Sequence, residues 1–405
     1  MSRLEALLRP QIDAASGDFA IAVSGGGDSM ALLDLASRLA PGRVRAVTLD
    51  HGLRPEAAAE ATMVADFCAA RGLSHQTLVW RGWDGQGNLQ AEARDARYRL
   101  IGAWAREAGL AEVWLGHSRD DVAETLLIRL GRAAGLDGLS RMAQIFEREG
   151  MRWRRPLLDA GREELRAHLR AADLTWAEDP SNADPAYLRV RARQALPSLA
   201  DLGISAEALS RSAAALAQSR TLIEEVMSAE WSARAWLEGG DILLRLEGAG
   251  PEVSRRLIRS ALSWIGGGGW PVRQSAMAAL AEHLSRAPHH TLAGCLVTRT
   301  TEGVRIAREW RAVRDLVGDG CAPWDGRWVL EPPAEGKAEG LEVRALGEGI
   351  AACPDWRATG LPRRSLMAGP AVWKAEKLIA APLAGLSAGW GAKLRPSFAT
   401  HPFAH

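Results

Sequence analysis

The chain has 405 residues, of which 47% are hydrophobic and 24% charged, and its formal net charge is +1. These values are ordinary for a globular protein of two or three domains. Four widely spaced cysteines form no Cys-x-x-Cys pair, which argues against a zinc site, an iron–sulfur cluster or a disulfide framework. The first residues resemble no signal peptide, and the chain contains no run of 18 uncharged apolar residues. We therefore expect a cytoplasmic protein without a membrane span.

The charged residues are unevenly distributed. A net charge of +1 does not by itself indicate a nucleic-acid binder, so any contact with a polyanion must come from local patches. The four lysines, Lys337, Lys374, Lys377 and Lys393, all lie near the end of the chain. Any cation that acts in the first 336 residues must therefore be an arginine, a histidine or a bound metal.

A phosphate-binding loop is predicted after the apolar run Phe19 to Val23. Ser24-Gly25-Gly26-Gly27-Asp28-Ser29 follows that run, and a helical pattern begins at Met30. Glycines at the start of a helix let backbone N–H groups approach an anion closely. The loop is not a Walker loop, which needs a lysine, and Met30 stands where a dinucleotide fingerprint needs its third glycine. A tight turn is the alternative, but the strand before it and the helix after it favour phosphate binding.

Strands and helices alternate over the first two hundred residues. After the loop helix at 29–40, strands are predicted at 43–49, 75–80 and 112–116, with helices at 55–72 and 88–109. This alternation predicts an α/β fold with a doubly wound parallel sheet. Ligands bind beyond the carboxyl ends of the strands in such sheets. Asp50, His51 and His117 follow strands, so we expect them to meet the phosphate loop in one cleft.

Two helices carry charged side chains that suit the same cleft. Arg94 and Arg97 share a helix face and could hold phosphates, although a solvated charged face is the common alternative. Asp120 and Asp121 open a later helix, where carboxylates often only cap the helix. Glu124 lies on the face of Asp121, and two such carboxylates could bind Mg²⁺ or an ammonium group.

These blocks together resemble the tRNA(Ile)-lysidine synthetase family, whose loop is that of the N-type ATP pyrophosphatases with an adenine nucleotide α-hydrolase-like fold. The resemblance runs in order through Ser24–Ser29, Leu49–Arg54, Asn88–Tyr98, Gly116–Thr125, Gly135–Met142, Arg155–Leu158 and Glu178–Asn182, followed by Arg189 and Arg193. It implies that ATP adenylates the C2 oxygen of cytidine 34 in tRNA(Ile) with a CAU anticodon. Free L-lysine then displaces AMP to give lysidine, which changes codon specificity from AUG to AUA.

The resemblance also implies roles for individual residues. Asp28 would help to place Mg²⁺, and Arg97, with Arg94, would stabilise charge on the α-phosphate. Asp121 and Glu124 would bind the amino groups of lysine, while Asp50, His51, His117 and Asp120 are expected in the cleft. The ATP phosphates would bind Ser24, Gly25, Gly26, Gly27, Asp28 and Ser29. A homodimer is compatible with the resemblance.

Contact with tRNA is expected from arginines. Residues 141–170 hold eight arginines against five acidic residues, with an ordinary surface helix at 161–172 as the alternative. Arg189, Arg191 and Arg193 lie beside Tyr187 and favour RNA, because guanidinium groups bind phosphates and stack on unpaired bases. Val190 departs from the family, which usually has asparagine there, so this position cannot supply a polar contact.

The expected domains are a catalytic domain at 1–200, a mainly helical tRNA-recognition domain at 201–312 and a small α+β domain at 313–405.

Two other functions are alternatives to lysidine formation. A pyrophosphatase of the same loop class that thiolates a tRNA base would bring cysteines near the loop, but Cys68 is the one cysteine in the first 290 residues. A non-catalytic RNA-binding protein would have no need to keep Asp28, Arg97, Asp121 and Glu124.

Overall fold

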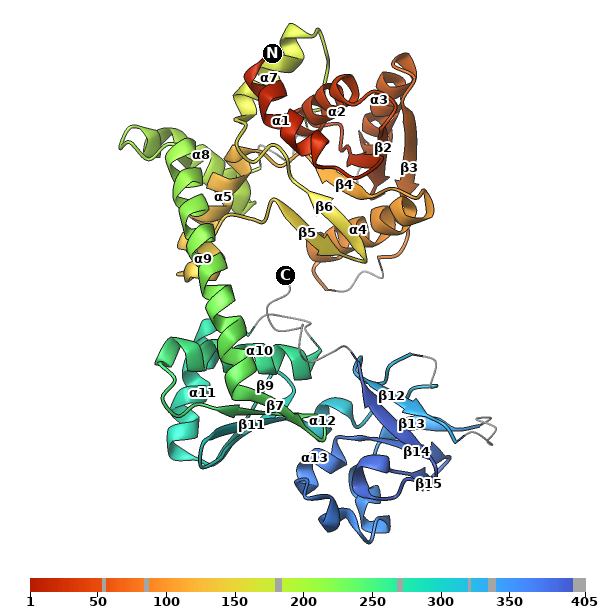
Figure 1. Ribbon diagram of the computed structural model, residues 1–405. Helices are drawn as coiled ribbons and strands as arrows, with labels where there is room; N and C mark the ends of the chain where they lie inside the picture. The colour runs from red at the N-terminus through yellow and green to blue at the C-terminus, as the bar shows by residue number, and fades with distance from the viewer. Residues whose placement is uncertain are drawn as a thin grey trace. The chain divides into compact units, whose positions relative to one another are not determined.

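The structure, a computed structural model, describes residues 1–52, 56–83, 87–178, 184–267, 272–319, 322–333 and 340–395. Leu53-Arg54 and Asp179–Asn182 of the family blocks and Lys337 lie outside the described residues. The chain divides into two compact units, Met1–Thr221 and Leu222–Ala404 (Figure 1). The three-domain division with boundaries after residues 200 and 312 remains a prediction.

The first unit alternates helices and strands up to the fourth strand. Its elements are α1 (Arg3–Asp13), β1 (Phe19–Ala22), α2 (Gly27–Leu39), β2 (Val44–Asp50), α3 (Glu56–Ala70), β3 (Ser74–Val79), α4 (Leu89–Glu107) and β4 (Glu112–Leu115). They continue with α5 (Arg119–Leu130), α6 (Leu136–Leu139), β5 (Ile145–Arg148), β6 (Met151–Arg154), α7 (Arg162–Ala171) and α8 (Leu188–Ala200). The helix and strand predictions for residues 29–116 are confirmed within a few residues.

The six strands of this unit form one sheet in the order β3-β2-β1-β4-β6-β5. Strands β3, β2, β1, β4 and β6 pair in parallel, while β5 pairs antiparallel with β6 at the edge. The predicted α/β fold with a parallel sheet is confirmed. Because β1 lies between β2 and β4, the loop after β1 has a strand end on either side of it.

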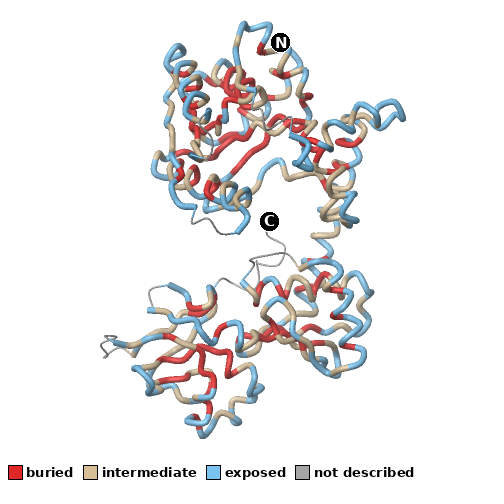
Figure 2. Tube along the Cα trace, turned by 180° about the vertical axis from the view of Figure 1, so that it is seen from behind, coloured by how far each residue is buried: buried red, intermediate tan, exposed pale blue. Residues whose placement is uncertain are grey.

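Helices cover both faces of the sheet. Apolar side chains of α1, α2, α3 and α7 form a core with β1 on one face, and those of α4 pack on the other. Phe19 of β1 and Trp114 of β4 stack with ring centroids 4.1 Å apart. Figure 2 shows the buried residues running along the strands of this sheet. The sheet is therefore a rigid base for the loops at its carboxyl edge.

The second unit contains a five-stranded antiparallel sheet and two smaller ones. The long helix α9 (Ala206–Arg234) contains the boundary between the units. The five-stranded sheet has the order β7-β8-β11-β10-β9 and is made of β7 (Ala235–Glu238), β8 (Asp241–Arg245), β9 (His289–Leu292), β10 (Cys295–Arg299) and β11 (Gly303–Arg308). Helices α10 (Pro251–Gly266) and α11 (Gln274–Arg286) bury Leu257, Leu262 and Leu280 against it. The helices expected in the middle region are present, and its strands pair into this one antiparallel sheet.

The chain from residue 310 onward combines short helices and strands, as expected for an α+β region. They contain α12 (Trp310–Val313), β12 (Trp328–Glu331), β13 (Glu342–Ala345), η2 (Gly347–Ala352), η3 (Trp356–Thr359), α13 (Arg363–Met367), β14 (Pro370–Lys374), β15 (Lys377–Ala380), η4 (Pro382–Ala384) and β16 (Gly391–Leu394). β12 pairs with β16, and β13, β14 and β15 form a three-stranded antiparallel sheet. Asp241 of β8 accepts hydrogen bonds from Arg305 and Ser365, at 2.9 and 2.6 Å, which ties the two parts of this unit together.

Candidate active site

The loop after β1 has the geometry of a phosphate cradle. Gly25 has φ +82°, a conformation that disfavours residues with a Cβ, and Gly26 is the N-cap of α2 without a side-chain hydrogen bond. The first N–H groups of α2 are therefore available to an anion. The Ser29 hydroxyl donates to Gly26 O at 2.9 Å and accepts from Ser24 N at 3.2 Å, which fixes the turn.

A second segment, containing Trp176 and Ala177, packs against this loop. The backbone N–H of Ala177 donates to Gly25 O at 2.9 Å, in an isolated parallel bridge. The Trp176 indole lies against Gly27, where an added Cβ would come within 3.5 Å of the ring. That distance is an ordinary van der Waals contact, so the indole packs beside the loop without itself requiring a glycine at position 27.

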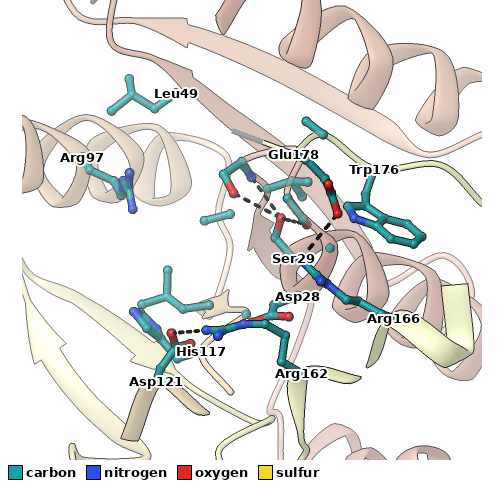
Figure 3. Close-up of a pocket in the computed structure, with 18 of the residues that line it drawn as sticks. Asp28, Ser29, Leu49, Arg97, His117, Asp121, Arg162, Arg166, Trp176 and Glu178 are labelled. Atoms are coloured by element: carbon teal, nitrogen blue, oxygen red, sulfur yellow. Dashed lines mark hydrogen bonds and ion pairs between the residues drawn. The ribbon is translucent and has the colours of Figure 1, made fainter. Parts of the chain in front are cut away.

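A cavity of about 790 Å³ opens at the carboxyl edge of the sheet, directly over the loop. Strand ends, the loop, and helices α4, α5, α7 and α8 all contribute to its wall, as Figure 3 shows for the labelled side chains. Predicted site residues in the wall are Ser24, Gly26, Gly27, Asp28, Ser29, Arg97, His117, Asp121, Arg189 and Arg193. The structure therefore brings the loop, an arginine of α4 and an acidic residue of α5 into one cavity.

Other predicted site residues do not form the wall of this cavity. Gly25 and the fully buried Glu124 lie behind it. Asp50 accepts a hydrogen bond from Gly52 N at 2.8 Å, and Arg94 donates to the Tyr98 hydroxyl at 3.2 Å. Arg191 is exposed on α8.

Asp120 and His51 each contact a residue of another element. Asp120 Oδ2 accepts from Arg162 N at 2.7 Å, so it caps α7, whereas the expectation was a cap on its own helix. His51 Nε2 lies 3.3 Å from a guanidinium nitrogen of Arg97. Burial lowers the pKa of the Arg97 guanidinium, with Arg94 adding to the effect, so an anion at Arg97 would be bound with little competition from water.

Asp28 and Asp121 are joined through Ser118, the N-cap of α5. The Ser118 hydroxyl lies 3.0 Å from Asp28 Oδ2 and 3.2 Å from Asp121 Oδ2, and Ser118 N donates to Asp121 Oδ2 at 2.8 Å. Burial and the charge of Asp121 raise the pKa of Asp28 to about 6, against the opposing effect of Arg162. Without a ligand, the positive charge near the carboxylate of Asp28 is therefore too small to offset its burial and the charge of Asp121.

Three arginines form ion pairs with Asp121 and Glu124, the acidic pair of α5. Arg162 donates to Glu124 Oε1 at 2.8 Å and to Asp121 Oδ1 at 3.1 Å. Arg189 donates to Glu124 Oε2 at 2.9 Å and to Asp121 Oδ1 at 2.7 Å, and Arg193 donates to Glu124 Oε1 at 2.9 Å.

These ion pairs decide the protonation of the acidic pair. Burial would raise the pKa of both carboxyls, but the arginines outweigh it, so that the pKa of Asp121 and that of Glu124 are lowered. Both groups are ionised at neutral pH. His117 beside them is neutral, because burial lowers its pKa to about 3, and its Nδ1 has no hydrogen-bond partner among the described residues.

Sequence reasoning missed several residues of the cavity wall. Arg162 also lies 3.5 Å from Asp28, and Figure 3 shows its side chain extending between Asp28 and Asp121. Arg166 pairs with Glu178 at 3.6 Å on the other side of the loop. Arg162 and Arg166 were counted only as members of a basic segment, since no spacing pattern links them to the loop. Trp176 lies two residues before the family block Glu178–Asn182, which was the available signal.

Two arginines of the basic segment 141–170 are buried and cannot contact RNA, which corrects the expectation for them. Arg154 forms a buried ion pair with Glu112 at 3.0 Å. Arg155 donates to Ala143 O at 2.6 Å and lies over the Phe146 ring, 4.0 Å from its centroid. Charge counted along the sequence therefore overstated the positive surface here.

Neither a ready-made metal cage nor a membrane-spanning helix is present among the described residues. These residues contain no group of three or more His, Cys, Asp or Glu side chains that could form a metal cage. Mg²⁺ typically needs only one or two carboxylates together with substrate phosphates, so Asp28 beside the phosphate cradle fits that ion. In the parts of the chain that the structure describes, every helix is too short or too polar to cross a membrane.

Comparison with known proteins agrees with this geometry. Residues 2–199 match the PP-loop domain family. The chain is 46% identical over 381 residues to the tRNA(Ile)-lysidine synthase of Ruegeria pomeroyi, covering 92% of this chain and 90% of that protein.

Two Bradyrhizobium proteins with the same name are also similar. The one from B. diazoefficiens is 50% identical over 209 residues, or 50% of this chain and 58% of that protein. The one from strain BTAi1 is 38% identical over 334 residues, covering 75% and 92%. The 46% identity with the Ruegeria pomeroyi protein over 92% of this chain shows that the protein belongs to the tRNA(Ile)-lysidine synthase family.

Proposed function

We propose that this protein ligates free L-lysine to C2 of cytidine 34 in tRNA(Ile) with a CAU anticodon, in an ATP-dependent reaction that releases AMP and pyrophosphate. The observation that carries the proposal is the link through Ser118, which places the phosphate cradle and the acidic residue Asp121 in one cavity. One site can then activate a base with ATP and present an amine to it.

The first step is adenylation of the cytidine. The C2 oxygen attacks the α-phosphorus of ATP, the bond to the β-phosphate oxygen breaks, and pyrophosphate leaves. The N–H groups of α2 would hold the phosphates, while Arg97, Arg162 and Arg166 in the cavity wall supply positive charge without any lysine. Asp28 would hold Mg²⁺, which supplies further neutralisation of phosphate charge.

The second step transfers lysine. The ε-amine, after losing a proton to solvent, attacks C2, and the bond between C2 and the AMP oxygen breaks, so that AMP leaves and lysidine forms. Asp121 and Glu124 carry the negative charges that would hold the amino groups of the incoming lysine. An ammonia or sulfur donor would have no use for such a pair.

Recognition of the tRNA is assigned to arginines and to the second unit. Arg191 is exposed on α8, and Arg189 and Arg193 flank it in sequence, which supports a phosphate contact at the cavity mouth. We assign recognition of the tRNA body to the predicted domains 201–312 and 313–405. A homodimer of the chain remains part of the proposal.

Base thiolation is the nearest alternative and is disfavoured by one observation. Cys68 is the only cysteine before residue 295, and it is buried in α3. Burial raises the pKa of its thiol to about 11, with a smaller opposing effect of Arg71, so that very little reactive thiolate exists at neutral pH.

One assay separates these functions. The protein is incubated with ATP, Mg²⁺ and tRNA(Ile), with and without lysine, and both pyrophosphate and AMP are measured. We expect pyrophosphate without lysine, AMP release only with lysine, and a lysidine mass at nucleoside 34. AMP release that needs a sulfur donor would indicate thiolation, and the absence of both products would indicate a non-catalytic RNA-binding protein.

A further inference from the structure

The acidic pair that lysine must reach is already occupied by arginines. Glu124 is 0% exposed, and its two oxygens together accept hydrogen bonds from Arg162, Arg189 and Arg193. Asp121 uses Oδ2 for Ser118 and Oδ1 for Arg162 and Arg189. An ammonium group cannot bind both carboxylates in this arrangement unless a guanidinium leaves.

Two of these arginines belong to a lightly anchored helix. Arg189 and Arg193 are four residues apart on α8, so both point to α5 from one helix face. Val190 is the one buried residue among the thirteen of α8, and Leu196 packs partly buried against the α5 cluster. Because few apolar contacts hold α8, its ion pairs with Asp121 and Glu124 are a large part of its attachment.

Arg162 differs from these two in its position. It is the first residue of α7, whose Leu165 and Leu169 are fully buried in the core of the sheet. It also contacts Asp28, so it belongs to the fixed wall of the cavity. The arginines of α8 can therefore move without moving Arg162.

Charge balance then decides when lysine can bind. Three guanidinium groups face three carboxylates once Asp28, which Arg162 also contacts, is counted with the acidic pair, so no net negative charge is left to attract an ammonium group. If Arg189 and Arg193 turn away, Arg162 alone faces the three carboxylates, and the two remaining negative charges attract it. The net charge of the site therefore changes with the position of α8.

We propose that Arg189 and Arg193 form a removable plug that closes the lysine site in the RNA-free enzyme, and that tRNA phosphates draw them off Asp121 and Glu124. Phosphates bind guanidinium groups in paired hydrogen bonds, and they compete directly with the carboxylates. Arg191, exposed on the same helix, would contact the RNA first. Lysine is thus admitted only after tRNA has bound. This inference rests on the proposed function and adds an order of substrate binding to it.

The experiment measures equilibrium binding of radiolabelled L-lysine to the full-length enzyme. Binding is measured with an ATP analogue that cannot be cleaved between the α and β phosphates, with and without tRNA(Ile). For the wild type we expect tRNA to raise lysine affinity by about tenfold or more, a coupling typical of linked sites. For Arg189→Gln combined with Arg193→Gln we expect high affinity without tRNA and little further effect of tRNA.

A matched control removes the same charge elsewhere in the first unit. Arg132→Gln combined with Arg211→Gln changes two exposed arginines outside the acidic pair, and should retain the wild-type dependence of lysine binding on tRNA. If the α8 double variant unfolds, Arg193→Gln alone removes a single contact with Glu124 and should give an intermediate affinity.

Two results would contradict the proposal that Arg189 and Arg193 close the lysine site. Equal lysine affinity of the wild type with and without tRNA would show that the arginines do not close the site. Loss of lysine binding in the α8 variants would make the arginines part of the lysine site itself. Both differ from failure of the proposed function, in which the wild type forms no lysidine when ATP, tRNA and lysine are all present.

Discussion

The Ser118 hydroxyl lies 3.0 Å from Asp28 Oδ2, so a fully buried serine at the start of α5 holds the aspartate of the phosphate loop. The same hydroxyl lies 3.2 Å from Asp121 Oδ2. Ser118 therefore sets the spacing between Asp28, beside the loop after β1, and Asp121 of α5, although its sequence position suggests only a helix cap.

Replacing Ser118 with alanine should affect both halves. Loss of this N-cap should cost about 1 kcal/mol of folding free energy, and kcat for lysidine formation should fall more than either substrate affinity. Urea unfolding and steady-state kinetics measure the two effects. Ser37→Ala, whose hydroxyl bonds only to Asp34 O within α2, is the control for losing a serine hydroxyl. A stability loss with unchanged kcat would limit Ser118 to capping.

Asp28→Asn should change the pH dependence of stability. The pKa of Asp28 is raised from 3.8 to about 6 in the folded state, so the folded protein binds this proton more tightly than the unfolded chain. Its contribution to stability is therefore fully present below about pH 4 and is lost as pH rises through 6.

The asparagine variant does not ionise and avoids this loss. We expect it to match the wild type at pH 4 and to exceed it above pH 6 by at most about 3 kcal/mol. Thermal unfolding from pH 4 to 8 tests this expectation, and equal stabilities at pH 7 would contradict the raised pKa. The same variant should not form the adenylate.

Gly116→Ala should displace the phosphate loop. A Cβ on Gly116 would lie 2.8 Å from Ser29 Cα and 2.9 Å from Ser29 N, both of them backbone atoms of α2. We expect a loss of about 1–3 kcal/mol in stability, typical of an overpacked contact, together with weaker ATP binding. Gly17→Ala is the matched control, since its Cβ would meet only Ala111 Cβ at 3.6 Å. Unfolding and nucleotide-binding assays that give both variants the same properties would contradict the close approach.

Glu124→Gln should raise the KM for lysine at least tenfold, a change of about 1.4 kcal/mol, and should change the KM for ATP much less. The physical reason is that the amide carries no charge for an ammonium group, while the phosphate cradle is formed by other residues. Steady-state kinetics in each substrate give the two values. Equal increases in both would place Glu124 with the metal and ATP.

Binding of tRNA should weaken steeply with salt, because phosphate contacts release counterions. Arg191→Gln should reduce the slope of log affinity against log salt by about one unit, which is the effect of losing a single phosphate contact. Filter binding at several salt concentrations measures the slope. A slope unchanged in this variant would remove Arg191 from the RNA contact.

The sequence by itself predicted the loop after β1, the parallel sheet and the meeting of Asp28, Arg97 and Asp121 at its carboxyl edge. These features follow from local signals, namely glycines before a helix and strands that alternate with helices, and from the rule that parallel strands end at the same edge. Strand β6 was missed because two of its four residues are arginines, and Arg154 is neutralised by Glu112, 42 positions earlier in the chain.

Only the tertiary structure decided which charges meet. Arg162, Arg189 and Arg193 were assigned to a basic segment or to RNA, and the folded chain places all three on Asp121 and Glu124. Residue patterns report the face on which a side chain lies, whereas ion pairs depend on how helices 38 to 69 residues apart pack together. The sequence thus predicted which elements meet at the cavity, and the packing of α7 and α8 against α5 determined which charges face one another there.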